Sequence, residues 1–448
     1  MANLNNVVVD GAVASPKSYF IEEALITANN GNEFEIKQYI QDIKITESIY
    51  RSGITASIYL LDSVNLVDRL KFAGNEKINL LIQRRELPTG DLKQYKIELY
   101  IAEIKDYNKY RPGTSSYTLM CVSEHAYINN VKILKRSFEG TIGELVSKIV
   151  KNDLLTEPHF INNSSKGLIK GIYPKLRPLS AISWLLKHSY EESTPFFFYE
   201  TLSNGIIFDS YKNLIKKDSF NDYNNFPNFR TDRSSKPEEV YIEEREKIIK
   251  LNSNLNISKY IASSKGAYGS QLHKIDIYNK KSEKIQFNYN KMLKLNKEDP
   301  VINEIKIGGR KITEWNEGKN YFVSLNSGAF SGFDNYHTPA DSTILKAEAY
   351  IANMDSTVQE IIIPGDFDLE SGSTINLNIL KSADITEEQL EGETDLRDMQ
   401  LSGKHLVTSI THHFSSDGYN MTVTAKKDSF IKSLNDIIEV EKWWMICL

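Results

Sequence analysis

The sequence predicts a mainly β protein of the α+β class, with two tandem antiparallel β units, a small α+β domain between them and an insertion in the second unit. Three observations support this prediction. Segments that alternate polar and apolar residues are separated by glycine-containing turn signals, which is typical of antiparallel strands. Two groups of such segments, far apart in the chain, resemble each other. The residues between the two groups change to helical periodicity.

Length and composition exclude several classes of protein. With 448 residues, 40% hydrophobic and 25% charged, and a mean hydropathy of −0.39, the chain suits a globular protein of about two to four domains. Its net charge of −5 provides no overall basic field, so tight wrapping of nucleic acid is not expected. Two cysteines, Cys121 and Cys447, are too few for a disulfide framework or a cysteine zinc site. No run of about 18 apolar residues occurs, so we expect a chain made in the cytoplasm that does not insert into membranes by itself.

The stretch 402–429 holds three of the eight histidines and could be either a metal site or a piece of sheet. As a strand rising about 3.3 Å per residue, it places His405 and His413 roughly 25 Å apart, with His412 on the opposite face. No single ion can bind all three. After the Asp417-Gly418 turn signal a second alternating segment follows, so we predict a two-faced hairpin and no metal.

The two faces of this hairpin differ in chemistry. We expect Leu406, Ile410 and Phe414 on the apolar face of the first strand. The other face then carries His405, Val407, Ser409, Thr411 and His413. In the second strand the polar side includes Thr422 and Thr424. The candidate polar face therefore consists of Ser409, Thr411, Thr422 and Thr424.

An earlier part of the chain resembles this hairpin. Ile101 and Ile104 match Val407 and Ile410, and the arm that begins at Tyr117 matches, with one residue of slippage, the arm that begins at Tyr419. Upstream, "GNEKINLLI" and "GSTINLNIL" share a glycine and an Ile-Asn-Leu step. A chance match of short β patterns is the alternative, but the agreement of order and spacing in two separate segments favours an internal repeat.

Between the repeats, helical signals dominate. Thr141 and Glu144 form a capping-box pattern before a helix whose apolar residues are Ile142, Leu145, Val146, Ile149 and Val150. A second helix is predicted over 179–192 after Pro178. A hairpin with arms 196–199 and 206–208 turns at Asn204-Gly205.

The remaining segments are predicted as follows. Residues 216–240 are polar and indicate a linker, 384–398 contain seven acidic residues and indicate a solvated loop, and a helix over 343–354 precedes a strand over 360–363. Trp443 and Trp444 near the end of the chain are candidates for docking on a partner, with packing inside the molecule as the alternative.

Known catalytic signatures are missing from the sequence. It contains no phosphate-binding GxxxxGK[ST], no GxGxxG, no HExxH and no GxSxG. Cys121 and His125 are interpreted as a buried small residue and its neighbour rather than a catalytic dyad. The group of Glu191, Glu192 and His188 is interpreted as a solvated helix end rather than an acid–base pair. We therefore predict no catalytic, cofactor or metal residues.

Several motifs in order resemble one family. They are "ITESIYRSGITASIYLLDSVNL" from residue 45, "PFFFYETLSNGIIFDSYKNLI", "GAYGSQLHKIDIYNK" from residue 266, and the closing "LSGKHLVTSITHHFSSDGYNMTVTAKKDS". Together they resemble the central baseplate hub protein of contractile-tailed bacteriophages and, more distantly, the hub portion of type VI secretion spike proteins. The resemblance covers about Phe34 to Ser429. The length of 290–340 and the tail after Ser429 depart from it.

The resemblance implies an architecture and partners. Family members have two tail-tube-like antiparallel β-barrels per chain and assemble as a homotrimer, a ring of near sixfold symmetry that joins a threefold spike to a sixfold tube. The implied partners are the central spike protein, tail-tube initiator and tube proteins, and baseplate wedge proteins, with DNA only passing through the channel. The polar face of Ser409, Thr411, Thr422 and Thr424 would line the channel or an interface.

The expected domains follow from the repeat and the resemblance. They are a first barrel, a middle α+β domain, a second barrel, an insertion and a C-terminal tail, at 1–124, 125–235, 236–289 with 341–430, 290–340, and 431–448. We expect a non-enzymatic structural hub located in the virion tail baseplate, or the hub of a related contractile injection system. The alternatives are a tail-associated cell-wall hydrolase and a carbohydrate-binding receptor module, for which the chain offers no separate lytic domain and no clustered aromatics beyond Trp443 and Trp444.

Overall fold

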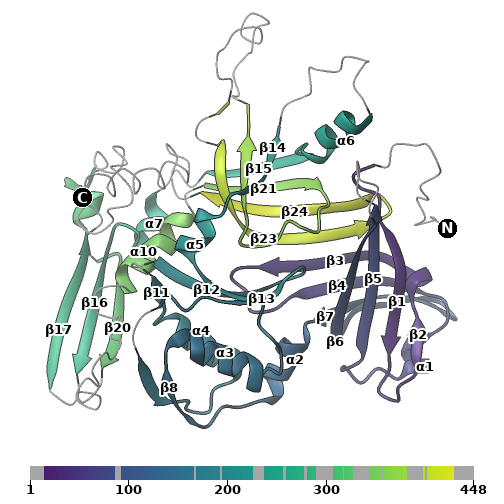
Figure 1. Cartoon of the computed structure of the whole chain (residues 1–448), viewed down its shortest axis with the longest axis horizontal. Helices are drawn as coiled ribbons and strands as arrows, with labels where there is room; N and C mark the ends of the chain where they lie inside the picture. Colours follow the sequence, from purple (N-terminus) through teal and green to yellow (C-terminus); the bar gives the residue numbers. More distant parts are fainter. Residues whose placement is uncertain are drawn as a thin grey trace, which may run out of the picture.

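The structure is a computed structural model, and Figure 1 shows the whole chain. It describes residues 15–85, 92–165, 168–191, 194–225, 237–255, 259–276, 280–288, 306–315, 317–325, 344–355, 357–380, 397–398 and 401–427. The predicted acidic loop at 384–398, apart from residues 397–398, lies outside these residues. Trp443, Trp444 and Cys447 also lie outside them.

The fold is mainly β, as predicted, and most strands belong to one large sheet. Its strands are β1 (Phe20–Thr27), β2 (Glu33–Glu35), β3 (Ile40–Ser48), β4 (Thr55–Asp62), β5 (Lys77–Arg85), β6 (Leu92–Arg111), β7 (Thr114–Val122), β14 (Ser219–Asn224), β15 (Lys250–Leu255), β21 (Thr357–Pro364), β22 (Thr374–Asn378), β23 (Gly403–Ser415) and β24 (Gly418–Lys427). Their order is β15-β21-β24-β23-β3-β4-β7-β6-β5-β1-β2, with β22 and β14 joined through β23. We call β1–β7 unit 1, and β14, β15 and β21–β24 unit 2.

The predicted internal repeat is confirmed by strand pairing. β5, β6 and β7 are consecutive neighbours in unit 1, and β22, β23 and β24 are consecutive neighbours in unit 2. Both central strands carry a β-bulge at the matching place, after Ile101 in β6 and after Val407 in β23. Each of these two residues also donates its backbone N–H at 2.9 Å to a carbonyl just before the preceding strand, that of Glu76 and that of Ser373. A bulge adds one residue and is not expected to recur in register by chance, so the two units share one design.

The two units are joined edge to edge. β3 of unit 1 pairs antiparallel with β23 of unit 2, from Ser48 opposite Ser409 to Ile43 opposite Phe414. One hydrophobic core runs through both units and includes Ile58 and Leu119 of unit 1 and Val423 and Tyr419 of unit 2. In Figure 1 the yellow strands of unit 2 continue directly into the purple strands of unit 1.

The middle domain packs around a separate core. Its helices are α2 (Glu124–Val131), α3 (Ile142–Asn152), α4 (Pro178–Leu186) and α5 (Tyr211–Lys216), and its strands are β8 (Ser137–Gly140), β9 (Phe160–Ile161), β10 (Ile169–Ile172), β11 (Tyr190–Glu191), β12 (Thr194–Thr201) and β13 (Gly205–Ser210). The predicted hairpin is confirmed as β12 and β13, with Gly205 at φ +76° in the turn. The apolar face of α3 shares this core with Phe196, Phe198 and Phe208 of the hairpin, whereas Phe197 packs with α5 in another cluster.

The capping box that the sequence predicts is present at the start of α3. The Thr141 hydroxyl accepts from the Glu144 N–H at 3.4 Å, and the Glu144 carboxylate accepts from the Thr141 N–H at 3.1 Å. Thr141→Ala is therefore expected to lower the free energy of unfolding by about 1 kcal/mol. Urea denaturation followed by circular dichroism measures this loss. Lys148→Ala, an exposed change in the same helix, is the control, and an equal loss there would contradict the capping role.

Two predicted segments differ from the structure. The helix expected over 179–192 ends at Leu186, because Ser189 turns back to the helix and donates its hydroxyl to the Leu185 carbonyl at 2.9 Å. The linker expected over 216–240 contains β14 and the start of α6 (Pro237–Arg245), while residues 226–236 lie outside the described residues. β14 runs parallel to β22, and its polar side chains are matched across strands, with the Asn376 amide 2.8 Å from the Asp222 carboxylate.

The helix expected over 343–354 is present as α10 (Ile344–Met354). A small sheet lies beside it. Its strands are β17 (Lys281–Asn288), β16 (Gly269–Asp276) and β20 (Lys319–Leu325), in that order. The same part of the chain contains α7 (Lys259–Ser264), β18 (Lys306–Ile307), β19 (Arg310–Lys311) and η2 (Ile312–Glu314). Two further short helices, α1 (Leu66–Leu70) and η1 (Lys37–Tyr39), belong to unit 1. β16 and β17 were expected in the second barrel. They pair instead with each other and with β20 of the 290–340 insertion, because Leu272 and Phe287 are buried against α10.

Candidate functional site

Two residues of the candidate polar face, Ser409 and Thr411, lie on the seam between the units, and the other two, Thr422 and Thr424, lie on the next strand, β24. Thr411 of β23 stands opposite Thr422 of β24 and Thr46 of β3, and Thr46 in turn stands opposite Thr55 of β4. The hydroxyls of Thr46 and Thr411 are 3.1 Å apart and share a hydrogen bond. The side chains of these four threonines, Thr46, Thr55, Thr411 and Thr422, are half-buried. A row of threonines in register therefore crosses four strands and both units.

Ser409 and Thr424 extend the same face. They stand opposite each other, both are half-buried, and the Ser409 hydroxyl donates to the Glu47 carbonyl across the seam at 3.0 Å. Hydroxyl side chains present neither a net charge nor a large apolar surface. This face can therefore contact water, or a polymer that slides past it, without holding that polymer tightly.

The bulge changes which residues share a face. Thr408 is the extra residue between Val407 and Ser409. The residues that precede it in β23 therefore point to the face opposite to the one that simple alternation predicts. Val407 packs in the core with Ile410, whereas Leu406 packs in another cluster, with Tyr199 and Met354. The expectation that Leu406 shares the face of Ile410, and Val407 the face of Ser409, is wrong for this reason. After Thr408 in the chain the expected faces are correct, with Ile410 and Phe414 buried and Thr411 half-buried.

The three histidines do not meet. His405 and His412 are fully buried, and burial lowers the pKa of each to about 3, so both are neutral. His405 donates Nδ1–H to the Gly403 carbonyl at 2.8 Å, and His412 bonds the Tyr419 hydroxyl at 2.8 Å. His413 contacts the Asp42 carboxylate of β3. Among the described residues no cluster of His, Cys, Asp and Glu could hold a metal ion.

The other chemical candidates are structural. Cys121 is buried in the core, and burial raises the pKa of its thiol to about 12, so it is not an activated nucleophile. His125 is buried as well and hydrogen-bonds the Ser52 carbonyl at 2.7 Å. The ring of His188 contacts that of Trp184 at an interplanar angle of 54°, whereas Glu191 lies in β11 and accepts from Ser210. Glu192 lies outside the described part of the chain.

Comparison with known proteins gives matches in structure only. No known family's sequence profile matches the chain, and no curated protein matches it. A tail protein from Neisseria meningitidis has a TM-score of 0.50 at 10% identity, over 92% of this chain and 98% of that one. The 43 kDa tail protein of prophage MuSo2 from Shewanella oneidensis has a TM-score of 0.50 at 11% identity, over 91% and 98%. This chain has the fold of bacteriophage tail proteins.

A third match has lower similarity. It is an Escherichia coli component of the type VI secretion system described as structurally similar to phage T4 tail proteins, with a TM-score of 0.42 at 10% identity, over 92% of this chain and 77% of that one. The mainly β, tail-protein-like fold predicted from the motifs is confirmed by the two tail proteins above. In the part of the chain that the structure describes, no helix is long and apolar enough to cross a membrane.

Within this tail-protein fold, one buried carboxylate joins three parts of the chain. Glu47 of β3 is 1% exposed and accepts two backbone N–H groups at 2.6 Å, from Leu202 after β12 and from Ser371 before β22. Burial raises its pKa to about 7, although the two N–H donors act in the opposite direction. Sequence reasoning missed it. The available signal was its alternation with Ile43 and Ile45, which places a charge on the core face.

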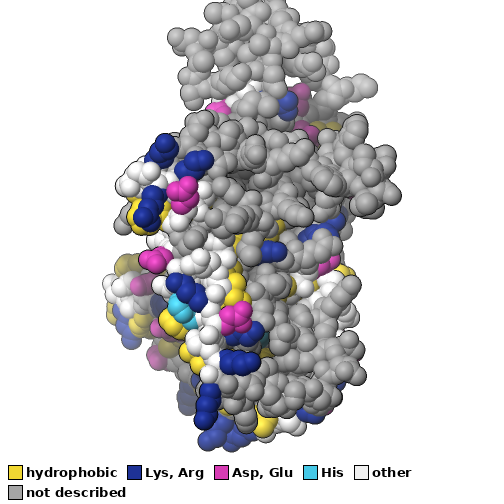
Figure 2. Space-filling model, turned by 90° about the vertical axis from the view of Figure 1, so that its left-hand side faces the viewer, with side chains coloured by type: hydrophobic (Ala, Val, Ile, Leu, Met, Phe, Trp, Pro, Cys, Tyr) yellow, Lys and Arg dark blue, Asp and Glu magenta, His cyan; other side chains and the backbone are white. Residues whose placement is uncertain are grey.

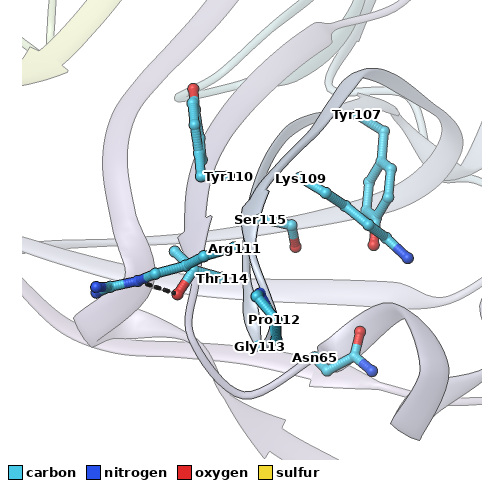
Figure 3. Close-up of a pocket in the computed structure, with 9 residues that line it drawn as sticks. All are labelled: Asn65, Tyr107, Lys109, Tyr110, Arg111, Pro112, Gly113, Thr114 and Ser115. Carbon is cyan, nitrogen blue, oxygen red and sulfur yellow. Dashed lines mark hydrogen bonds between the residues drawn. The ribbon is translucent and has the colours of Figure 1, made fainter.

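A pocket of about 340 Å³ lies at the tip of the β6–β7 hairpin. It is lined by Asn65, Tyr107, Lys109, Tyr110, Arg111, Pro112, Gly113, Thr114 and Ser115. Figure 3 shows the side chains of Lys109 and Arg111 extending in opposite directions from the hairpin. A small-molecule site requires polar groups that converge, so this pocket is better described as a surface hollow on an exposed hairpin.

The outer side of the small sheet has mixed chemistry. Phe322 is 71% exposed and stacks on His273 with ring centroids 4.9 Å apart. Figure 2, which faces this side of the molecule, shows hydrophobic, cationic and anionic side chains interspersed among the described residues. Dark-blue Lys and Arg side chains are more frequent than magenta Asp and Glu side chains in this view.

Proposed function

We propose that this chain is a structural hub of a phage tail baseplate or of a related contractile injection machine, without enzymatic activity. Three copies would form a ring of six similar β units, which joins a threefold spike to a sixfold tube. The observation that carries the proposal is the internal repeat with matching bulges, joined edge to edge into one sheet. A duplicated chain is the simplest way for a threefold assembly to present sixfold contacts.

The proposal assigns roles to the faces and segments. The threonine row and Ser409 would face the channel or an interface, because hydroxyls wet a passage without binding DNA strongly. The central spike would bind on one side, tube-initiating and tube proteins on the other, and wedge proteins outside. Trp443 and Trp444 would dock on a partner. The protein would be made in the host cytoplasm and reside in the virion tail. Its domains would be a first barrel, a middle α+β domain, a second barrel, an insertion and a C-terminal tail, with β16 and β17 assigned to the insertion.

Electron microscopy of the purified protein tests the proposal. Negative-stain end views should show rings of three chains with a central hole and an outline that looks sixfold. Compact monomers that persist at high concentration and after co-expression with the spike protein would contradict it. Zymography on cell-wall material tests the enzymatic alternative, and a clearing band abolished by changing a single carboxylate of this chain would overturn the structural role.

A further inference from the structure

Two stretches of the middle domain contain no acidic residue. They are residues 125–138 and 158–190, although the chain as a whole carries a net charge of −5. The antiparallel bridge between Leu134 and Leu176 brings the two stretches side by side, and the Leu134 N–H donates to the Leu176 carbonyl at 2.7 Å. Figure 1 shows their elements, α2, β8 and α4, together in the lower part of the molecule. The fold thus gathers positive charge on one surface of an acidic protein.

We call this surface the α2–α4 patch. Its lysines are exposed, and none has an acidic partner among the described residues: Lys132, Lys135, Lys175 and Lys187. Large apolar side chains lie among them in contact with solvent, with exposed fractions of 76% for Val131, 52% for Ile133, 72% for Ile172 and 37% for Trp184. Apolar side chains grouped among cations, without acidic residues, are typical of a surface that another segment covers.

Contacts inside the domain hold the parts of the patch together. The Trp184 ring meets the edge of the Phe138 ring with centroids 5.7 Å apart. Phe138 in turn packs on Gly171 of β10, where an added Cβ would lie only 2.7 Å from the ring. The Arg177 guanidinium donates to the Asn130 side-chain oxygen at 2.9 Å and ties the start of α4 to α2. The spacing between the charged and apolar side chains is therefore set by regular structure.

The sequence of the C-terminal segment 428–448 has the complementary character. Its four acidic residues outnumber its two lysines: Asp428, Asp436, Glu439 and Glu441 against Lys432 and Lys442. Ile431, Leu434 and Ile438 recur at positions i, i+3 and i+7, the spacing of one face of a helix. An acidic segment with an apolar face matches a basic surface with apolar side chains in both charge and hydrophobicity.

The last described strand ends within reach of the patch. Lys426, near the end of β24, donates its ammonium group to the Tyr50 hydroxyl at 3.3 Å. The carbonyl of Ser52, two residues further on, hydrogen-bonds His125 near the start of α2 at 2.7 Å. From there α2 runs for eight residues, about 12 Å, to Val131 in the patch. The segment that follows β24 spans about 30 Å even as a helix, so it can reach the patch with the described fold unchanged.

We propose that the C-terminal segment 428–448 packs on the α2–α4 patch of its own chain. Its apolar face would cover Ile133 and Ile172, and its acidic residues would pair with the patch lysines. Trp443 and Trp444 would then be held on the middle domain, where the partner assigned to them above would meet them. DNA fits the patch less well, because contacts to phosphate groups make no use of exposed isoleucine and valine side chains. The inference does not depend on the ring.

Photocrosslinking from Cys447 tests the proposal in the unmodified full chain. Cys121 is buried, so benzophenone maleimide should label Cys447 alone. Irradiation should link the label to residues 131–137 or 172–187 of the same chain, as identified by mass spectrometry of the single-chain band on a denaturing gel. Links between copies would assign the patch to the segment of a second copy. Links to other surfaces, or no links, would leave the patch to an external partner, and each of these three outcomes would overturn the inference.

Charge reversal on the patch is the second test. Lys135→Glu with Lys175→Glu should lower the yield of the internal link about fivefold, because two exposed attractive pairs become repulsive. Adding Asp436→Lys with Glu439→Lys to that variant should restore the yield. Lys148→Glu, an exposed change on α3 outside the patch, is the control and should leave the yield unchanged. An unchanged yield in the patch variant, or an equal loss in the control, would contradict packing of the segment on this patch.

Discussion

Replacing Ile410 with aspartate is expected to abolish soluble protein. Ile410 is fully buried in the core shared by the two units, and it lies between Val423 of β24 and Glu47 of β3. A carboxylate there would have no cationic partner, and the lost packing adds to its desolvation, so we expect a loss of more than about 4 kcal/mol. Soluble yield and the midpoint of urea unfolding measure the effect.

The neighbouring change Thr411→Asp is the matched control. Thr411 lies on the opposite, half-buried face, where its hydroxyl meets that of Thr46. We expect a cost of at most about 1 kcal/mol, because water can reach the new carboxylate. Equal damage from the two variants would show that the faces of β23 above the bulge are wrongly assigned.

Removing the carboxylate of Glu47 is expected to loosen the junction of three parts of the chain. Glu47→Ala leaves the N–H groups of Leu202 and Ser371 without their acceptor. Each such group costs about 1–3 kcal/mol, so the free energy of unfolding should fall by roughly 2–6 kcal/mol. Hydrogen exchange at these two amides should rise before global unfolding. Unchanged exchange would contradict the junction role.

The same residue predicts a pH dependence. Burial raises the pKa of Glu47 from 4.5 to about 7, so between these values the folded protein holds a proton that the unfolded chain has released. Its contribution is fully present below about pH 4.5 and is lost as the pH rises through about 7. In Glu47→Gln this dependence is absent, which leaves a difference of at most roughly 3 kcal/mol, at about 1.4 kcal/mol per unit.

Urea unfolding of both proteins between pH 5 and pH 8 measures that difference. The wild type should lose stability relative to Glu47→Gln as the pH rises. Parallel curves for the two proteins would mean that the two N–H donors keep Glu47 ionised throughout the range.

Local patterns predicted the elements that depend on local interactions. The capping box of Thr141, the turn at Asn204-Gly205 and the hairpin around Gly418 are present as expected. Each depends on residues within about four positions of one another, so short-range preferences suffice. The sequence pattern also placed Thr411 and Thr422 on one face, because alternation follows directly from the strand period.

The tertiary structure decided everything that depends on pairing between distant residues. Nothing local to Thr408 marks it as an extra residue, so the faces of Leu406 and Val407 were exchanged. Glu47 is buried only because segments after β12 and before β22 approach β3, and β14 is a strand only because β22 is its neighbour. The sequence by itself determined the periodicity, the turns and the repeat. Which edges meet, and in which register, was determined by closure of a core that links residues hundreds of positions apart.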